Sequence, residues 1–249
     1  MIQLMQGDCL ELMQNIPDHS VDMVLCDPPY GIDFQSCRIK DKAKRKPKIQ
    51  NDKTPFTAFI PLLKRVLKPT GCVMIFTRWD VQQTFIDAMR EADLAPNSCI
   101  IWDKKIHGMG DLKRAFGSRY ESILFHAEPN FRFPGKRPTD IIQCQRVAAA
   151  KLVHPNEKPV ELLCTLLTEC SHPGGVILDC FAGSGSTGIA CCKTCMNFIG
   201  IELDCRYYVI AQNRIAQQIN QMEMGFDGVK GVGLLCQELR TGLVKDMAD

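Results

Sequence analysis

The sequence lacks a long hydrophobic run, a strong net charge and any internal repeat, and each absence excludes a class of protein. A membrane-spanning helix needs about 18–20 consecutive apolar residues, and no run in the 249 residues comes close. Lys and Arg number 30 against 28 Asp and Glu, a formal net charge of +2, which excludes a histone-like binder or a disordered polyelectrolyte. The first residues have neither the basic start nor the apolar stretch of a signal peptide, so we expect a cytoplasmic protein without a membrane partner.

A disulfide framework is not expected either, although the chain has 14 cysteines. Most of them stand inside apolar runs, as Cys26 and Cys72 do, which is typical of small buried side chains in a reducing compartment. The closely spaced group is Cys191-Cys192-Lys193-Thr194-Cys195. A structural zinc ion needs four ligands, for which Cys205 and His172 are conceivable partners, but helix packing is the favoured interpretation. We therefore predict no metal.

The chain alternates short apolar, β-rich runs with amphipathic helical stretches. The expected strands are Ile2–Met5, Val21–Cys26, Cys72–Thr77, Ser98–Trp102, Ser122–His126, Val176–Asp179 and Phe198–Glu202. The expected helices are Phe56–Leu67, Val81–Ala92, Pro159–Cys170 and Cys205–Gln221. This alternation predicts one α/β domain with a Rossmann-like, mostly parallel, seven-stranded sheet and helices on both faces. No helix is expected between the fourth and fifth strands, so these two should form an antiparallel hairpin at the edge of the sheet.

Two stretches interrupt this pattern. Residues 34–53 carry eight Lys or Arg side chains against Asp41 and Asp52. Such a charge run is either a solvated surface loop or an arm that contacts phosphates, and taken alone it favours the solvated loop. Residues 129–153 have little periodicity and could be a recognition insert or a long connection.

The segment 176–188 reads as a strand, a glycine-rich turn and the start of a helix. Gly183, Gly185 and Gly188 fit the pattern G-x-G-x-x-G, and the acidic Glu202 follows about 20 residues after the first glycine, as the dinucleotide-type fingerprint requires. Glycines let the backbone approach a ligand, and the helix start offers free N–H groups. The pattern predicts an adenosine-containing cofactor whose ribose hydroxyl donates to Glu202, with a tight turn that binds no ligand as the alternative.

A second motif, Asp27-Pro28-Pro29-Tyr30, follows the apolar run Val21–Cys26. Two consecutive prolines fix φ and remove two N–H donors, so the backbone leaves the sheet at this point. The carboxylate and the aromatic ring are then presented at the carboxyl end of a strand, where open α/β sheets bind ligands.

With these motifs in this order, the chain resembles the S-adenosylmethionine-dependent amino-methylating DNA methyltransferases. More narrowly, it resembles their circularly permuted class, in which Asp-Pro-Pro-Tyr precedes the glycine turn. The resemblance covers roughly residues 2–216 and includes Gly7-Asp8-Cys9 and His154-Pro155-Asn156-Glu157-Lys158-Pro159. Two positions depart from the pattern: relatives often have Pro where Cys180 stands, and Gln is frequent where Glu157 stands.

The resemblance implies a single domain made of a catalytic half (1–128), a short target-recognition insert (129–153), a cofactor-binding half (154–222) and a C-terminal appendage (223–249). It implies a catalytic pocket formed by Asp27, Pro28, Pro29 and Tyr30. S-adenosylmethionine is expected to bind Asp8, Cys9, Asp27, Asn156, Lys158, Asp179, Phe181, Ala182, Gly183, Ser184, Gly185 and Glu202. A flipped base requires a held backbone, so double-stranded DNA is expected to contact Arg38, Lys40, Lys42, Lys44, Arg45, Lys46 and Lys48.

The resemblance also implies the chemistry. The Asp27 carboxylate and the Pro28 carbonyl would accept the two hydrogens of a target amino group, while Tyr30 stacks on the flipped base. Asp at the first catalytic position resembles the adenine members, so we expect a site-specific adenine-N6 DNA methyltransferase, as in restriction–modification. A cytosine-N4 enzyme and a catalytically silent DNA-binding subunit are the alternatives, and a homodimer is compatible with the family. The sequence says nothing of an accompanying restriction endonuclease.

Overall fold

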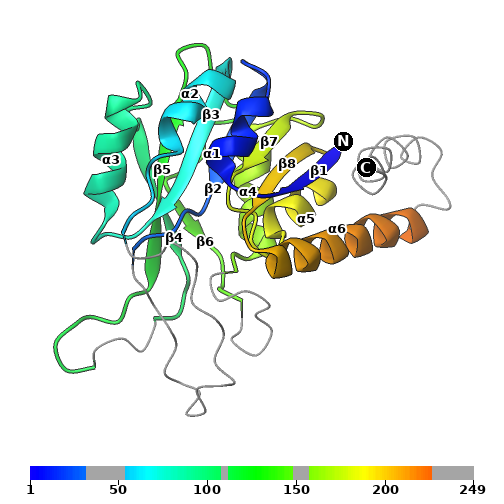
Figure 1. Cartoon of the computed structure of the whole chain (residues 1–249). Coiled ribbons are helices and arrows are strands. Elements are labelled where there is room, and N and C mark those ends of the chain that lie inside the picture. The colour runs from blue at the N-terminus through cyan, green and yellow to red at the C-terminus, as the bar shows by residue number, and fades with distance from the viewer. Residues whose placement is uncertain (32–53, 108–111, 148–156, 226–249) are drawn as a thin grey trace.

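The computed structural model describes residues 1–31, 54–107, 112–147 and 157–225, and a single sheet runs through this part of the chain (Figure 1). Its strands are β1 (Ile2–Gln6), β2 (Val21–Cys26), β3 (Leu67–Thr77), β4 (Ser98–Asp103), β5 (Tyr120–Ala127), β6 (Ile141–Gln143), β7 (Val176–Asp179) and β8 (Asn197–Glu202). They lie in the order β1-β8-β7-β2-β3-β5-β4-β6. β5 runs antiparallel to its neighbours β3 and β4, and the other pairs of neighbours are parallel.

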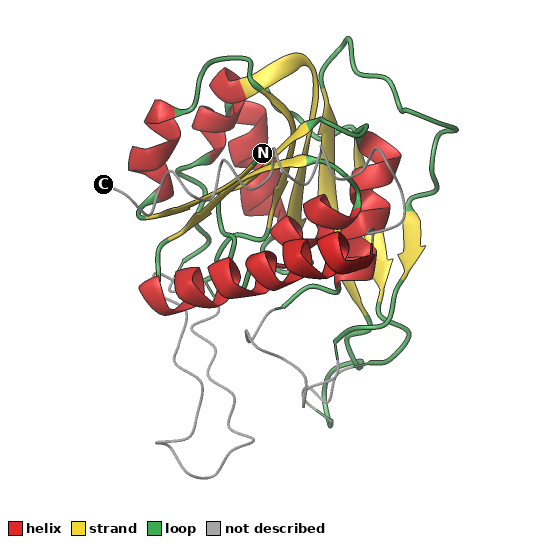
Figure 2. Cartoon of the chain, turned by 90° about the vertical axis from the view of Figure 1, so that its right-hand side faces the viewer, coloured by secondary structure: helices red, strands yellow, loops and turns green. Residues whose placement is uncertain are grey.

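Helices cover both faces of the sheet (Figure 2). They are α1 (Cys9–Leu12), α2 (Ile60–Val66), α3 (Gln82–Glu91), α4 (Val160–Cys170), α5 (Ser186–Lys193) and α6 (Cys205–Gly225), with a short 3₁₀ turn η1 (Met13–Asn15) after α1. Helix α5 packs between α4 and α6, while α2 packs against α3. Within the described ranges, none of these helices is both long and apolar enough to cross a bilayer.

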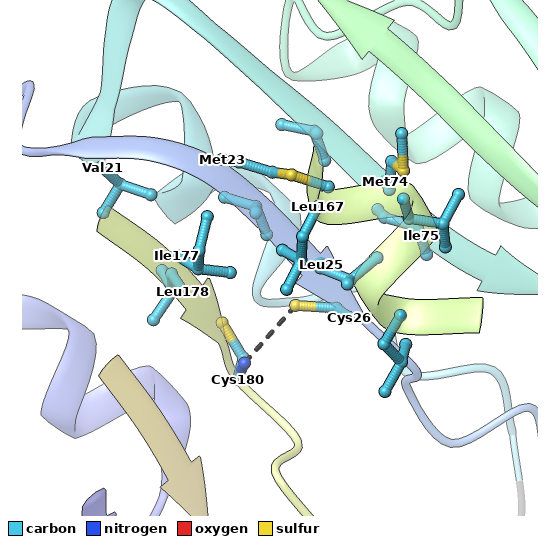
Figure 3. Packing of buried hydrophobic residues seen from close by; sticks show 14 of the residues in the cluster. Val21, Met23, Leu25, Cys26, Met74, Ile75, Leu167, Ile177, Leu178 and Cys180 are labelled. Carbon is cyan, nitrogen blue, oxygen red and sulfur yellow. Dashed lines mark hydrogen bonds between the residues drawn. The ribbon is translucent and has the colours of Figure 1, made fainter. Parts of the chain in front are cut away.

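Strand β2 lies in the middle of the sheet and is buried along almost its whole length. Helices on both faces leave no side of such a strand in water, which explains why it reads as a continuous apolar run. In Figure 3, Leu167 of α4 lies over Leu25 of β2, with Ile177 of the neighbouring strand β7 close by. This packing fixes the carboxyl end of β2, where the Asp-Pro-Pro-Tyr motif begins.

The predicted α/β sheet with helices on both faces is confirmed, but the sheet has eight strands rather than seven among the described residues. The additional strand, β6, lies inside the segment 129–153 and pairs in parallel with β4, Ile101 opposite Ile141. The β4–β5 hairpin is antiparallel as predicted, yet β6 covers β4, so the hairpin does not form the edge. A strand of three residues is too short to show the alternation from which strands are predicted.

The first strand of the chain lies beside the last. The Phe198 N–H donates to the Met1 carbonyl at 3.0 Å, and the Gly7 N–H donates to the Glu202 carbonyl at 3.0 Å. Helix α6, which follows β8, also packs against β1. Strand β1 therefore extends the sheet beside β8, as expected for a circular permutation.

Candidate active site

A pocket opens at the carboxyl ends of β1, β2, β7 and β8. The sequence motifs that line it are Gly7-Asp8-Cys9 after β1, Asp27-Pro28-Pro29-Tyr30 after β2, Asp179-Cys180-Phe181-Ala182-Gly183-Ser184 from β7 onward, and Glu202-Leu203-Asp204 from β8 onward. These four strands are adjacent and parallel, so their carboxyl ends lie at one edge of the sheet, where α/β proteins bind ligands. Motifs far apart in the sequence thus meet in a single pocket.

The glycine turn between β7 and α5 wraps around the carboxylate of Glu202. Gly183 has a φ of +53°, a left-handed conformation that favours glycine. Its N–H donates to Glu202 Oε2 at 2.7 Å, and the Asp204 N–H donates to Oε1 at 2.8 Å. Each carboxylate oxygen can accept a further hydrogen bond, so Glu202 keeps acceptor capacity for ribose hydroxyls. Burial raises the pKa of Glu202 above its ordinary value.

Asp179, the last residue of β7, is buried beneath the same turn. Its Oδ1 accepts the Phe181 N–H at 3.0 Å, and its Oδ2 accepts the Thr187 hydroxyl at 2.6 Å. Burial nevertheless outweighs these hydrogen bonds and raises the pKa of Asp179 to about 7. A carboxylate held in this way favours a cationic ligand, because a nearby positive charge stabilises its ionised form.

Three further residues of the pocket suit an adenosine-containing cation: Ser186, Asp8 and Phe181. Ser186 Oγ, in the first turn of α5, lines the pocket and is buried without a hydrogen-bond partner. A buried hydroxyl of this kind is costly unless a ligand satisfies it. Asp8 adds a third carboxyl group beside Asp179 and Glu202, while the ring of Phe181, packed edge-on against Phe59 at 4.8 Å, adds apolar surface.

Asp27 lies at the end of β2 and is held by two donors. The Tyr30 hydroxyl donates to its Oδ1, and Lys158 Nζ donates to its Oδ2 at 2.5 Å. Burial raises the pKa of Asp27, and the charge of Lys158 offsets only part of this effect. The pKa of Tyr30 is raised well above its ordinary value, by burial and then by Asp27, so its hydroxyl remains a donor.

The ring of Tyr30 is itself buried in this conformation. It is 6% exposed and packs edge-on against Phe85, with the ring centroids 6.4 Å apart. Tyr30 nevertheless lines the pocket, so a base that stacks on its ring would have to enter the pocket.

The structure brings most of the predicted site residues into the pocket. All four residues predicted to be catalytic line it, as do the predicted cofactor residues Asp8, Cys9, Asp27, Lys158, Asp179, Phe181, Ala182, Gly183, Ser184 and Glu202. Asn156 lies outside the described residues, and so do the seven basic residues predicted to contact DNA.

Gly185 was predicted to bind the cofactor but does not line the pocket. It caps α5 with a φ of +81°, and a Cβ placed on it would lie 2.9 Å from the Ala211 Cβ of α6. The glycine is therefore required by the turn and by the close approach of two helices. The cysteine group 191–195 also has a packing role: Cys191 and Cys192 are buried in α5, and no metal-binding cluster is found within the described ranges.

Sequence reasoning missed several residues of this region. Thr187 and Asp204 stand next to motif residues, so a wider reading of each motif would have included them. Phe56 also lines the pocket, with its ring stacked on Phe59, and no motif signals it. Glu121, at the start of β5, lies 3.3 Å from the Nζ of Lys158 although it belongs to no recognised motif.

Known proteins resemble the chain over most of its length. Residues 21–213 match the N6/N4 methyltransferase family, described as DNA methylase. The Escherichia coli (strain K12) protein YubD, named as a methylase, is 31% identical over 228 residues, which cover 90% of this chain and 95% of that protein.

Two solved structures share the fold. M1.HpyAVI in complex with SAM is 24% identical, with a TM-score of 0.65 over 86% of this chain and 100% of that chain. The cytosine-N4-specific PvuII DNA methyltransferase is 15% identical, with a TM-score of 0.67 over 88% of this chain and 92% of that chain. The family match and the relative at 31% identity agree with the site geometry, and the chain therefore belongs to the DNA methylase family of N6 and N4 methyltransferases.

Proposed function

We propose that this protein transfers a methyl group from S-adenosylmethionine to N6 of adenine in double-stranded DNA. The observation that carries the proposal is the placement of Asp27 and Glu202 in one pocket. The first is a carboxylate able to accept from a target amino group, and the second has acceptor capacity for the hydroxyls of an adenosine cofactor.

S-adenosylmethionine, the ligand of the M1.HpyAVI complex, supplies an electrophilic methyl group on a positively charged sulfur when it is bound. Glu202 would accept hydrogen bonds from its ribose hydroxyls. Asp179 would stabilise its positive charge, and the N–H groups in the first turn of α5 would bind its anionic carboxylate. Asp8, which caps α1 through its Oδ1 and the Leu10 N–H at 2.8 Å, keeps its other carboxylate oxygen for the pocket.

The protein must make the target nitrogen more nucleophilic, because the lone pair of an exocyclic amino group is delocalised into the base. The Asp27 carboxylate and the Pro28 carbonyl can each accept one of its two hydrogens. Acceptors placed in this way favour a tetrahedral nitrogen with a free lone pair, which is the geometry of the transition state. Proline at position 29 contributes no N–H that could compete for these acceptors.

The choice of adenine rests on the aspartate at the first catalytic position, which resembles the adenine-methylating members. Cytosine N4 carries the same kind of amino group, and the PvuII enzyme, which is specific for it, shares the fold. The same acceptors would serve either base, so the base has to be identified by experiment.

A second surface supports a DNA substrate. Residues 112–119, which lead into β5, extend beyond the end of the sheet that carries Asp27 (Figure 1). Leu112 and Phe116 are 77% and 104% exposed there, and Lys113 and Arg114 stand between them in the sequence. Proteins that open a duplex combine basic side chains for the phosphates with apolar side chains inserted between bases.

The test is a methylation assay on unmethylated duplex DNA with S-adenosylmethionine, followed by digestion and mass spectrometry of the nucleosides. N6-methyladenine is the expected product. N4-methylcytosine would keep the reaction and change the base. A protein that binds the cofactor but methylates neither base would be a silent DNA-binding subunit, and the proposal would be wrong.

A further inference from the structure

A row of alternating charges leads from the Asp27 carboxylate along the same end of the sheet to the end of β4. Lys158 Nζ lies 2.5 Å from Asp27 Oδ2 and 3.3 Å from Glu121 Oε2, and the other oxygen of Glu121, Oε1, lies 2.6 Å from Lys104 Nζ. The four side chains come from four places: the end of β2, the residue before the cap of α4, the start of β5 and the end of β4. All are at least four-fifths buried.

Lys158 has little freedom within this row. Its ammonium lies 4.8 Å from the centre of the Phe76 ring of β3, between the two carboxylates. Burial alone would lower the pKa of Lys158, but Asp27 and Glu121 raise it, so the side chain carries its charge. Burial likewise opposes ionisation of Glu121, but Lys158 and Lys104 together lower its pKa.

The arrangement matters for Asp27 because Lys158 acts on it in two opposing ways. The ammonium lowers the pKa of the buried carboxyl group and so favours its ionised form, which an acceptor of amino hydrogens requires. The same ammonium, if paired with Asp27 alone, would draw the carboxylate toward itself and weaken it as an acceptor for the substrate. Glu121 provides a second carboxylate on the other side of the Lys158 ammonium, and its attraction for the ammonium balances that of Asp27.

We propose that Glu121 is a positioning residue for methyl transfer, which shares the charge of Lys158 and thereby keeps Asp27 available to the target amino group. Glu121 does not line the pocket itself, so it touches neither cofactor nor base. The inference rests on the proposed function, because it assigns Glu121 a part in the activation of the same amino group. Among the described residues, two more charged groups act within this region: Arg78 lowers the pKa of Tyr30, and Asp27 raises that of Asp179.

The variant Glu121→Gln tests the proposal with two readouts. Single-turnover methyl transfer, followed with isotope-labelled cofactor so that either base is detected, should slow by about tenfold, less than the 10²–10³-fold that follows loss of a directly acting group. The acidic limb of the variant's pH–rate profile should move to lower pH by about one unit, because a nearby negative charge that raises the pKa of Asp27 has been removed. The affinity for the cofactor should not change.

Two further variants separate positioning from folding. Lys104→Met removes a positive charge from the outer end of the row, so the acidic limb should move in the opposite direction, toward higher pH. Glu121→Asp keeps the charge and should bring the limb back toward the wild-type position. These two variants decide the matter if Glu121→Gln fails to fold. The matched control is Glu128→Gln, since Glu128 follows the other end of β5 and pairs with Lys64 at 2.6 Å, away from the pocket.

A Glu121→Gln variant with wild-type rate and pH profile would overturn the proposal. So would a variant whose rate and melting temperature fall while the acidic limb stays in place, because that is the result of a structural role. Carboxyl ¹³C NMR measures the titration of Asp27 without turnover. In Glu121→Gln, the midpoint of this titration should move to lower pH. Absence of methyl transfer in the wild-type protein would instead contradict the proposed function, so the two failures are distinguishable.

Discussion

The Thr187 hydroxyl donates to Asp179 Oδ2 over 2.6 Å, and this hydrogen bond joins the first turn of α5 to the end of β7. Both residues line the pocket, so the carboxyl group that they share faces the cofactor site. One further hydrogen bond, from the Phe181 N–H, completes the partners of this buried carboxyl group.

Cofactor binding should release protons below pH 7. Burial raises the pKa of Asp179 to about 7, and a cofactor with a net positive charge should lower it. Titration calorimetry at pH 6 in buffers of different ionisation enthalpy should detect up to about one released proton per site. Asp179→Asn should remove this release, and a wild-type protein that releases none would contradict the assignment.

The raised pKa of Asp179 also predicts how the free energy of unfolding changes with pH. The folded chain binds the Asp179 proton more tightly than the unfolded chain does, so this group favours folding most below about pH 4. That contribution should disappear as the pH rises to about 7. Asp179→Asn should therefore flatten the pH dependence of the free energy of unfolding between these values, as measured by urea denaturation.

Asp27→Ala should abolish methyl transfer and leave cofactor binding largely intact. A lost acceptor at the reacting atoms costs at least about 10²-fold in rate, whereas the cofactor keeps Glu202 and Asp179. The melting temperature should also fall, because Lys158 loses its nearest buried partner. Asp18→Ala, at an exposed ion pair with Arg65, is the control for the removal of a carboxylate. Retained turnover in Asp27→Ala would exclude Asp27 from the chemistry.

Gly185→Ala should destabilise the cofactor half by about 2–4 kcal/mol, the sum of a left-handed backbone and an overpacked helix contact. The φ of Gly185 is +81°, and the new Cβ would lie 3.0 Å from the Ala211 Cα. Gly135→Ala, where a Cβ would meet nothing within 4 Å, should change the stability by no more than about 0.5 kcal/mol. Equal melting temperatures for the two variants would contradict the packing role of Gly185.

Phe116→Ser should weaken duplex binding by about tenfold or more if the ring stacks on a base, since such stacking contributes roughly 1–3 kcal/mol. The signal of a fluorescent base analogue at the target position should fall with it, because fewer bases would leave the duplex. Val209→Ser, on the exposed face of α6, is the control for the loss of an exposed apolar side chain. Unchanged affinity and fluorescence in Phe116→Ser would remove this loop from the DNA surface.

The basic stretch 38–48 makes a separate prediction, which rests on the sequence. Simultaneous replacement of Lys44, Arg45 and Lys46 by Gln should lower the affinity for DNA and reduce the slope of log K against log salt by about 2–3. An unchanged slope would show that these side chains do not neutralise phosphates.

The predicted site residues that the structure brings into one pocket stand in consecutive positions of the sequence. Asp27 to Tyr30 and the turn around Gly183 each follow an apolar strand directly, so the strand and the ligand-facing residues could be located together. Glu121 could not be found in this way, because its role depends on Lys158, which lies in a distant segment of the sequence. The same holds for the packing role of Gly185, because its neighbour Ala211 belongs to another helix, and for β6, which is too short to be recognised before it pairs with β4.

The hydrogen bond from the Gly7 N–H to the Glu202 carbonyl has a consequence during synthesis. Strand β1 leaves the ribosome before the other strands of the sheet, whereas its partner β8 follows all of them. Nascent chains that end before Glu202 expose an unpaired strand edge and lack the Glu202 carboxylate of the pocket, so they should neither bind the cofactor nor resist proteolysis. The permuted order of the strands thus delays the closure of the pocket until nearly the whole domain has been translated.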